Sequence, residues 1–207
     1  MLKLVYKDFL VHRTLLAVYA ALALFLTVQF GGAEAPLAGA TMVGMFLPFA
    51  AANQDDRFNA HVLLNSLPVT RRELVTAKYV FHLAAGVGLM LVAAVGRAAL
   101  GGVPVPRALE LLTNVVVLAV FLSTFFPLYY WLGQRFVYAG MLTLLLIVLA
   151  VEPIVYNLAV RNNFWGLLEW LRTLPEWWLY AWPAAAGVLL LAASWRVSVA
   201  IYERKEF

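Results

Sequence analysis

The sequence predicts an all-α integral membrane protein with six transmembrane helices. Of its 207 residues, 64% are hydrophobic and 13% are charged, whereas about 25% of residues are charged in ordinary soluble domains. The mean hydropathy is +0.86, and the apolar residues form long runs separated by short charged or glycine- and proline-containing segments. Such a chain accommodates about six spans of ~20 residues with short connections. We therefore expect one transmembrane domain over residues 1–207 and no second, soluble domain.

The long apolar runs locate the spans and their connections. The six spans are expected at about 14–30, 37–53, 71–100, 108–131, 136–156 and 177–195. Small residues recur on one face of the second and third spans, at Gly39, Ala40 and Gly44 and at Ala84, Gly88 and Gly96. Such faces allow helices to pack closely in lipid. Pro127 is expected to kink or end the fourth span, and residues 164–171 are expected to form an outer interfacial helix.

The first 13 residues favour a short helix on the cytoplasmic surface of the membrane. Leu2, Val5 and Phe9 share one helical face, with His12 close to it, and the basic residues lie elsewhere, as in interfacial helices. A charged flank without fixed structure is the alternative. At the outer end of the third span, Arg97 is expected to extend its side chain toward the interface.

The distribution of charge predicts the orientation. An even number of spans puts both termini on one side, which would carry eleven Lys and Arg residues against four on the other. Basic residues accumulate on the cytoplasmic side of membrane proteins, so both termini are expected in the cytosol. Because the basic residues are spread over the membrane flanks, the net charge of +4 indicates attraction to anionic membrane lipid and not binding of nucleic acid.

The coupling region, residues 54–70, lies between the second and third spans and carries a dense group of charges. Asp55 or Asp56 is expected to cap a helix over about 57–66, because a carboxylate accepts hydrogen bonds from the first turn and favours the positive end of the dipole. Pro68 is expected to end that helix.

A second helix start follows at once. Thr70 and Glu73 have the spacing of a capping box, and Val69 and Leu74 have that of a hydrophobic staple. Both signals make Arg71 the first helical residue. A helix of ~30 residues from that point is ~45 Å long, which exceeds the ~30 Å of hydrocarbon. Its first turns would then project into the cytosol, where a rigid helix can transmit a push.

The sequence lacks the common motifs for ATP hydrolysis, intramembrane catalysis and metal binding. No GxxxxGK[ST] pattern occurs, so any ATP hydrolysis is expected on a separate subunit. HExxH and GxSxG are absent as well, which argues against an intramembrane enzyme. Cysteine is absent and the three histidines lie in different segments, so no metal or other cofactor is expected in this chain. A secondary transporter or channel, and a membrane scaffold without an ATPase partner, remain the alternatives.

Short fragments in a fixed order extend over nearly the whole chain. They are Lys7-Asp8, Asp55-Asp56-Arg57, Leu63-Leu64-Asn65-Ser66-Leu67-Pro68-Val69-Thr70-Arg71, Glu73-Leu74-Val75, Lys78-Tyr79, Phe126-Pro127-Leu128-Tyr129-Tyr130 with Gly133, and Ile201-Tyr202-Glu203-Arg204-Lys205-Glu206-Phe207. With the layout of the spans, they resemble the ABC-2-type transporter permeases, in particular the six-span permeases of bacterial peptide, phenol-soluble modulin and bacteriocin exporters. The Ala/Leu-rich spans and the Trp-rich outer segment depart from the more familiar members, which puts the identity of the cargo in doubt.

The resemblance implies a permease dimer, formed with a second copy or a paralogue, and two ATPase subunits that carry the ATP and Mg²⁺. It implies a bacterial cytoplasmic membrane and export of amphipathic or hydrophobic cargo such as peptides. It also implies a coupling helix after the second span, where the capping signals independently predict a helix. The expected ATPase-coupling residues are Asp55, Asp56, Arg57, Phe58, Leu63, Leu64, Leu67, Pro68, Thr70, Arg71, Arg72 and Glu73.

The first two spans are expected to line the route of the cargo if they meet at the axis of the dimer. The expected residues are Phe25, Gln29, Phe46, Phe49 and Asn53, with Glu152 as an acidic addition. Packing in the core or against lipid is the alternative for the spans, and a position at the outer interface is the alternative for Glu152.

Overall fold

A computed structural model describes residues 2–30, 37–57, 69–101, 108–133, 139–140, 143, 173 and 175–204. Within these ranges the chain forms helices and no strand. The helices are α1 (Leu2–Val11), α2 (Arg13–Phe30), α3 (Ala38–Arg57), α5 (Arg71–Gly101), α6 (Ala108–Leu132) and α9 (Glu176–Arg204). The predicted all-α class is confirmed for the described part of the chain.

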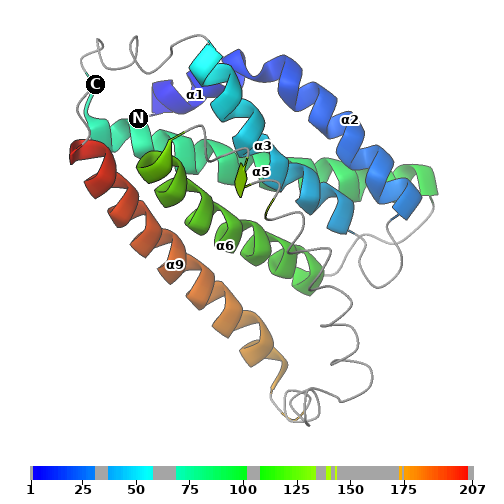
Figure 1. Cartoon of the computed structure of the whole chain (residues 1–207). Coiled ribbons are helices and arrows are strands. Elements are labelled where there is room, and N and C mark those ends of the chain that lie inside the picture. Colours follow the sequence, from blue (N-terminus) through cyan, green and yellow to red (C-terminus); the bar gives the residue numbers. More distant parts are fainter. Residues whose placement is uncertain are drawn as a thin grey trace.

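Helix α5 is the central element. It contacts each of the other five described helices. The pair α2 and α3 packs on one side of it, and the long pair α6 and α9 packs on the other (Figure 1). The beginning of α1 and the end of α9 lie toward the same end of the molecule (Figure 1). Any displacement of α5 is therefore passed directly to every other described helix.

Three of the described helices are long and apolar enough to cross a membrane. They are Arg71–Ala99, Glu110–Leu132 and Tyr180–Arg204, and a fourth is added if the bent pair Leu2–Val11 and Arg13–Gln29 forms one span. The six-span topology stays a prediction, because the expected fifth span at 136–156 lies almost entirely outside the described residues. The expected interfacial helix at 164–171 lies wholly outside them.

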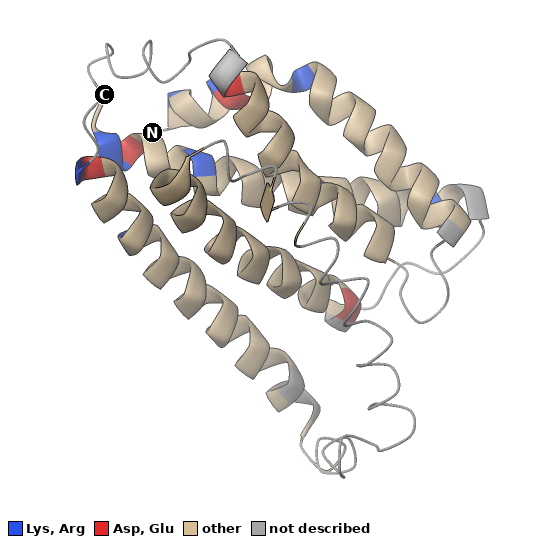
Figure 2. Ribbon diagram, viewed as in Figure 1, with Lys and Arg blue, Asp and Glu red and all other residues tan. Residues whose placement is uncertain are grey.

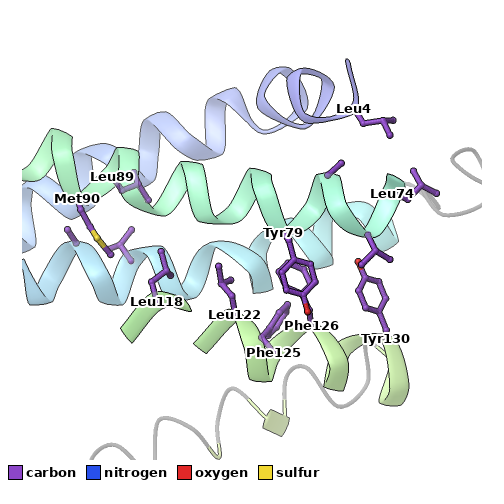
Figure 3. Close-up of a cluster of buried hydrophobic side chains, with 14 of the residues drawn as sticks. Leu4, Leu74, Tyr79, Leu89, Met90, Leu118, Leu122, Phe125, Phe126 and Tyr130 are labelled. Atoms are coloured by element: carbon purple, nitrogen blue, oxygen red, sulfur yellow. The ribbon is translucent and has the colours of Figure 1, made fainter. Parts of the chain in front are cut away.

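The apolar interior runs between α5 and α6. Met90 of α5 and Leu118 and Leu122 of α6 are fully buried, and Figure 3 shows them in one continuous layer. Toward the end where α5 begins, the layer becomes aromatic, with the rings of Tyr79 and Phe126 4.4 Å apart between centroids. Such pairs add favourable ring contacts to the burial of apolar surface.

Small residues bring the helices close together, but one predicted contact is wrong. Gly44 of α3 lies against Gly86 of α5, where an added Cβ would stand 3.6 Å from the Gly86 Cα. An added Cβ at Gly96 would lie 2.4 Å from a leucine side chain of α2. An added Cβ at Gly88, in contrast, would meet no described residue within 4 Å. Residues two positions apart on a helix point in different directions, so the close contact at Gly86 turns Gly88 away.

Helices α3 and α9 extend past the ends expected for the corresponding spans, whereas α6 ends close to the expected position 131. Helix α3 continues to Arg57 and not only to position 53. Helix α6 contains Pro127 and continues to Leu132, so the proline does not end it. Helix α9 continues to Arg204, nine residues beyond position 195. In α9 the extension is explained by packing, since Ser198 and Tyr202 in this stretch are both buried.

Helix α1 forms as predicted, but its predicted apolar face lies against the protein. Val5 and Phe9 pack against the cluster that contains Phe81, and the Phe9 and Phe81 rings are 5.0 Å apart in an edge-on arrangement. His12, which follows α1, is fully buried, whereas Leu2 is 80% exposed. The expected grouping of these side chains toward the membrane is therefore wrong.

The exposed stripe of α1 consists of Leu2, Tyr6 and Leu10 instead. These residues are spaced by four and so share one helical face. The rotation of α1 follows from Asp8, whose side chain is buried on the opposite side together with Leu4. A buried carboxylate must reach its cationic partners, and that requirement fixes which face of α1 is outward.

Arg97 also differs from its prediction, because its side chain is covered and not extended. Only 8% of Arg97 is exposed, and its Nη1 has no hydrogen-bond partner among the described residues. Helix α2 packs close to this end of α5 at Gly96, and this contact explains why the neighbouring arginine is enclosed.

Candidate functional site

Charged side chains gather at the end of the molecule where α5 begins and α9 ends (Figure 2). The capping box predicted there is present. The Thr70 N–H donates to Glu73 Oε2 over 3.1 Å, and the Glu73 N–H donates to Thr70 Oγ1 over 3.2 Å. Helix α5 begins at Arg71, and Val69 packs on the same cluster as Leu74. Both predicted helix-start signals are confirmed, because these contacts satisfy donors that the first helical turn leaves free.

Arg71 joins the start of α5 to the end of α9. Its Nη1 donates to the Tyr202 carbonyl over 3.2 Å and to the Glu203 carbonyl over 2.8 Å. Helix α9 ends at Arg204, so both carbonyls belong to the last turn, which lacks intrahelical donors and carries the negative end of the helix dipole. A cation from α5 thus caps the C-terminus of a helix more than 130 residues away in sequence.

A second link between α5 and α9 lies one turn further along. The Arg72 guanidinium carbon lies 4.8 Å from the centroid of the Trp195 ring, within the range of a cation–π interaction. The Trp195 Nε1–H donates to Thr76 Oγ1 over 3.0 Å, and the Thr76 hydroxyl donates to the Arg72 carbonyl over 2.7 Å. These contacts and the Arg71 cap fix the two helices side by side at this end.

A chain of hydroxyl groups extends the same junction to α6. The Tyr79 hydroxyl lies 2.6 Å from Ser194 Oγ and 2.8 Å from Ser198 Oγ. Ser194 Oγ donates to the Ser123 carbonyl over 2.6 Å. Since a hydroxyl has one proton, Ser194 must accept from Tyr79, and Ser198 must donate to Tyr79. The result is a directional chain from Ser198 through Tyr79 and Ser194 to α6.

Lys78 links α5 to the other side of the molecule. Its ammonium group forms an ion pair and hydrogen bond with the Asp55 carboxylate near the end of α3. It also lies 3.8 Å from Asp8 Oδ1 of α1. The same Asp8 oxygen is 2.9 Å from Lys7 Nζ. Relative side-chain exposure is 3% for Asp8, 15% for Lys78 and 18% for Asp55, so the two pairs of Lys78 are largely shielded from water.

His12 completes this group from the turn between α1 and α2. Its ring is fully buried, and Nδ1 lies 2.8 Å from Gln54 Oε1. The other ring nitrogen, Nε2, is 4.0 Å from Asp55 Oδ1 and forms no hydrogen bond in the described part of the chain. We call Lys7, Asp8, His12, Asp55 and Lys78 the ion cluster.

The ion cluster ties together α1, α3 and α5. With a neutral His12, its two lysines balance its two aspartates. Removing a charge from water costs several kcal/mol, which its partner must offset, so loss of one member leaves an expensive buried charge. The cluster therefore fixes how the start of α5 sits against the end of α3.

The structure describes the side chains of five of the predicted ATPase-coupling residues, and these five lie toward the end of the molecule where α5 begins. They are Asp55, Thr70, Arg71, Arg72 and Glu73. Asp56 and Arg57 lie in the last turn of α3, and their side chains are outside the described set. The remaining expected residues, Phe58, Leu63, Leu64, Leu67 and Pro68, lie outside the described residues as well. The coupling helix expected over about 57–66 thus stays a prediction.

The expected role of Asp55 as a helix cap is corrected. Asp55 lies inside α3, which runs to Arg57, and its carboxylate is bound to Lys78. A residue in the body of a helix, with its side chain engaged by another helix, cannot cap the start of the next one. The ion pair across helices explains why α3 extends past the predicted end.

The five described residues of the expected cargo route differ in their exposure. Phe25 and Gln29 are exposed on α2, whereas Phe46 and Asn53 are partly buried on α3. Phe49 packs into the interior, with its ring 4.7 Å from Phe125 and 5.9 Å from Phe121. Glu152 lies outside the described residues. The role of all six as a cargo route stays a prediction.

Four cluster members were missed as site residues by the sequence analysis, namely Lys7, Asp8, His12 and Lys78. The available signal was a pair of acids and a lysine placed beside long apolar segments, where unpaired charges are costly. Asp8 and Lys78 also occur in the fragments that carry the family resemblance. No group of three or more acidic, histidine or cysteine side chains that could hold a metal ion occurs among the residues described.

The comparisons with known proteins agree with this picture at the level of the family. The family model of the ABC-2 family transporter protein matches residues 3–203, which is nearly the whole chain. No curated protein and no solved structure matches the chain. Members of this family are membrane components of ABC transporters and are not themselves catalytic. The chain therefore belongs to the ABC-2 transporter family.

Proposed function

We propose that this chain is the permease subunit of an ABC exporter, driven by ATP hydrolysis on a separate subunit that docks at the end of the molecule where α5 begins. The permease role in an ABC transporter follows from the family. The docking position, the exporter direction and the cargo are the parts that we propose. Amphipathic or hydrophobic cargo, such as peptides, suits the largely apolar helices of the chain.

One observation carries the proposal: α3, which leads into residues 58–68, is bound to α5, which follows them. Asp55 lies just before residues 58–68, and Thr70 caps the helix just after them. Lys78 of that helix binds Asp55. A force applied to residues 58–68 would therefore act on two helices that an ion pair holds together, and so it would be transmitted to α5.

The force would spread from α5 to the rest of the permease. Because α5 contacts all five other described helices, its displacement moves both sides of the molecule. Arg71 would carry the same displacement into α9. A rigid helix with a fixed first turn is the mechanical element that such coupling requires, since helix shifts at packed interfaces are a common form of switching.

The contact with the ATPase would use the apolar residues Phe58, Leu63 and Leu64. Arg57 would lie at the rim of that contact. Arg71 and Arg72 are also among the expected ATPase-coupling residues, but both side chains are already engaged with α9. They would thus support the junction from within the permease. The working unit would be a permease dimer with two ATPase subunits, in a bacterial cytoplasmic membrane with both termini in the cytosol.

The test is purification of the full-length, tagged chain from its native membranes in mild detergent. We expect an ATPase with a P-loop to accompany the wild-type chain, and Leu63→Asp to remove it while membrane insertion is kept. Leu2→Asp is the matched control, because Leu2 is already 80% exposed on α1. Absence of any ATPase beside the wild-type chain, or its retention by Leu63→Asp, would overturn the proposal. Ion conductance by the chain alone would favour a channel.

A further inference from the structure

Lys78 faces two acids that belong to two different helices. The Asp55 carboxylate of α3 holds it in a direct ion pair, and the Asp8 carboxylate of α1 lies 3.8 Å away. At this distance Asp8 attracts Lys78 without a directed hydrogen bond. A small shift of the lysine side chain would exchange one carboxylate for the other.

Each acid has a second partner in place. Asp8 has Lys7, whose Nζ lies 2.9 Å from Asp8 Oδ1 and which is 37% exposed. Asp55 has His12, whose Nε2 lies 4.0 Å from Asp55 Oδ1. A permanent ion pair between Lys78 and Asp55 still needs Lys7 beside the buried Asp8, but it gives no role to His12 beside Asp55. An exchange needs both, because a buried carboxylate left alone by the moving lysine would be very costly.

His12 is only a reserve partner in this state, because Nε2 is 4.0 Å from Asp55 Oδ1, too far for a hydrogen bond. Gln54 Oε1 accepts a hydrogen bond from His12 Nδ1, an arrangement that both the neutral ring and the cation allow. In the neutral ring with its proton on Nδ1, Nε2 offers only a lone pair to the Asp55 carboxylate. A second proton, taken from cytosolic water, would turn Nε2 into a donor and His12 into a cation that can pair with Asp55.

We propose that Lys78 exchanges between Asp55 and Asp8 during the transport cycle, and that His12 takes up a proton and binds Asp55 while the lysine is away. Lys78 is then a positioning residue that sets whether the start of α5 is fastened to α3 or to α1. This inference rests on the proposed function, because it is the coupling region next to Asp55 that would drive the exchange.

The surroundings of His12 are consistent with such a step. The charged or titratable side chains placed around it are Lys7 and Asp8 on α1, Asp55 on α3, and Lys78 on α5. His82, also on α5, donates from Nδ1 to the Lys78 carbonyl over 2.7 Å, and its buried Nε2 has no hydrogen-bond partner among the described residues. From α2 the neighbouring residue is Arg13, which is exposed.

The deciding variant is Asp8→Asn in the complete transporter. With a permanent Lys78–Asp55 pair, Asp8→Asn would lower the thermal midpoint, because the ion cluster loses one of its charges. The folded complex would still hydrolyse ATP at close to the wild-type rate, because Asp8 forms no hydrogen bond with Lys78. The exchange predicts that ATP hydrolysis by the purified complex in proteoliposomes falls about fivefold or more, the size of a typical coupling between sites. The ATPase should still co-purify. Wild-type hydrolysis by this variant would overturn the exchange.

A charge swap separates pairing from exchange. Asp55→Lys combined with Lys78→Asp restores one ion pair, but it places a carboxylate on α5 beside that of Asp8, where no exchange is possible. We expect the swap to recover the thermal midpoint lost by either single variant, with hydrolysis still low. Recovery of both the midpoint and the rate of hydrolysis would overturn the proposal.

A second variant controls for a loss of stability in Asp8→Asn. If Asp8→Asn lowers the thermal midpoint, Asp8→Glu keeps the carboxylate and must restore hydrolysis. Failure of Asp8→Glu to do so counts against the exchange.

The pH profile tests the role of His12. Hydrolysis by the wild-type complex should fall as the pH rises, because the proposed proton uptake by His12 helps to release Lys78. His12→Gln can donate to Asp55 at any pH and should give a flat profile; an unchanged slope would remove His12 from the mechanism.

Failure of the exchange can be distinguished from failure of the proposed function. If no ATPase accompanies the wild-type chain, the proposed function itself fails. If the ATPase is present and Asp8→Asn is fully active, only the exchange fails.

Discussion

The Arg71 guanidinium donates to the Glu203 carbonyl over 2.8 Å, and this bond joins the first residue of α5 to the last turn of α9. The neighbouring carbonyl of Tyr202 shares the same nitrogen. Helix C-termini attract cations because their carbonyls are unsatisfied and carry the negative end of the dipole. Here the cation comes from another helix, so the cap is a tertiary contact that defines the geometry of the candidate coupling site.

Arg71→Ala should loosen the end of α9. Loss of two charge-assisted hydrogen bonds is expected to cost about 1 kcal/mol, toward the low end for bonds to charged groups because the site is partly exposed. The readout is the rate of protease cleavage near the C-terminus of the purified chain in detergent. Arg71→Lys keeps the charge and should give an intermediate rate. Arg196→Ala, at an exposed position of the same helix, is the control, and cleavage as fast as in Arg71→Ala would contradict the cap.

Thr70→Ala should destabilise the first turn of α5 by about 1 kcal/mol, the usual cost of losing an N-cap. The substitution removes the acceptor for the Glu73 N–H and the hydroxyl that binds the Glu73 carboxylate. Hydrogen exchange of the first-turn amides, measured by mass spectrometry, should become faster there while the middle of α5 is unaffected. Thr70→Ser retains the hydroxyl and should exchange like the wild type. Equal protection in the alanine variant would show that the tertiary contacts alone hold this turn.

Gly86→Ala and Gly88→Ala form a matched pair on α5. At Gly86 the new Cβ would lie 2.4 Å from Leu118 Cδ2, and Leu118 is fully buried. Overpacking of this kind costs about 1–3 kcal/mol. At Gly88 no atom of the described part of the chain lies within 4 Å of the new Cβ, so alanine should be neutral or should stabilise by up to about 1 kcal/mol through its helix propensity. Thermal unfolding in detergent measures both, and equal midpoints would contradict the packing of α5 on α6.

The sequence is sufficient to predict features that depend on neighbouring residues. The capping box at Thr70 and Glu73, the start of α5 at Arg71 and the approximate length of this helix, which has 31 residues, all follow from the sequence. The cap and the start depend on side chains within four positions of one another. The membrane class and the family depend on composition and on the order of short fragments, which are also properties of the sequence alone.

Contacts between helices could not be predicted in the same way, because they depend on how each helix is rotated. The choice of Gly88 over Gly86 as a contact, and the outward face assigned to α1, were wrong for that reason. The binding of Lys78 to Asp55 and Asp8 likewise needs three helices in their final places. The same contact extends α3 beyond the end that its apolar run predicts.

The fragments that carry the family resemblance converge at this end of the molecule. Lys78 meets Asp8 and Asp55, and Arg71 meets the backbone of Tyr202. The rings of Tyr130 and Tyr202 lie 5.2 Å apart between centroids. Described residues of fragments that are far apart in the sequence thus form one junction between helices. This junction explains why the fragments occur together, although each fragment alone is weak evidence for the family.

Tyr79→Phe tests the hydroxyl chain that joins α5, α9 and α6. The substitution removes the donor to Ser194 and the acceptor of Ser198, and both serines are buried. Hydrogen bonds between membrane helices contribute about 1 kcal/mol each or somewhat less, so the thermal midpoint in detergent should fall measurably. Ser198→Ala should have a smaller effect, because Tyr79 still donates to Ser194 and the chain to Ser123 stays intact.

The control for Tyr79 is Tyr6→Phe, since the Tyr6 side chain is 66% exposed on α1 and its loss of a hydroxyl should leave the midpoint unchanged. The test is which of Tyr79→Phe and Ser198→Ala lowers the thermal midpoint more. If Ser198→Ala destabilised the protein more than Tyr79→Phe, the Tyr79 hydroxyl would not be the centre of the chain, because its removal breaks the contacts to both serines whichever way the protons run.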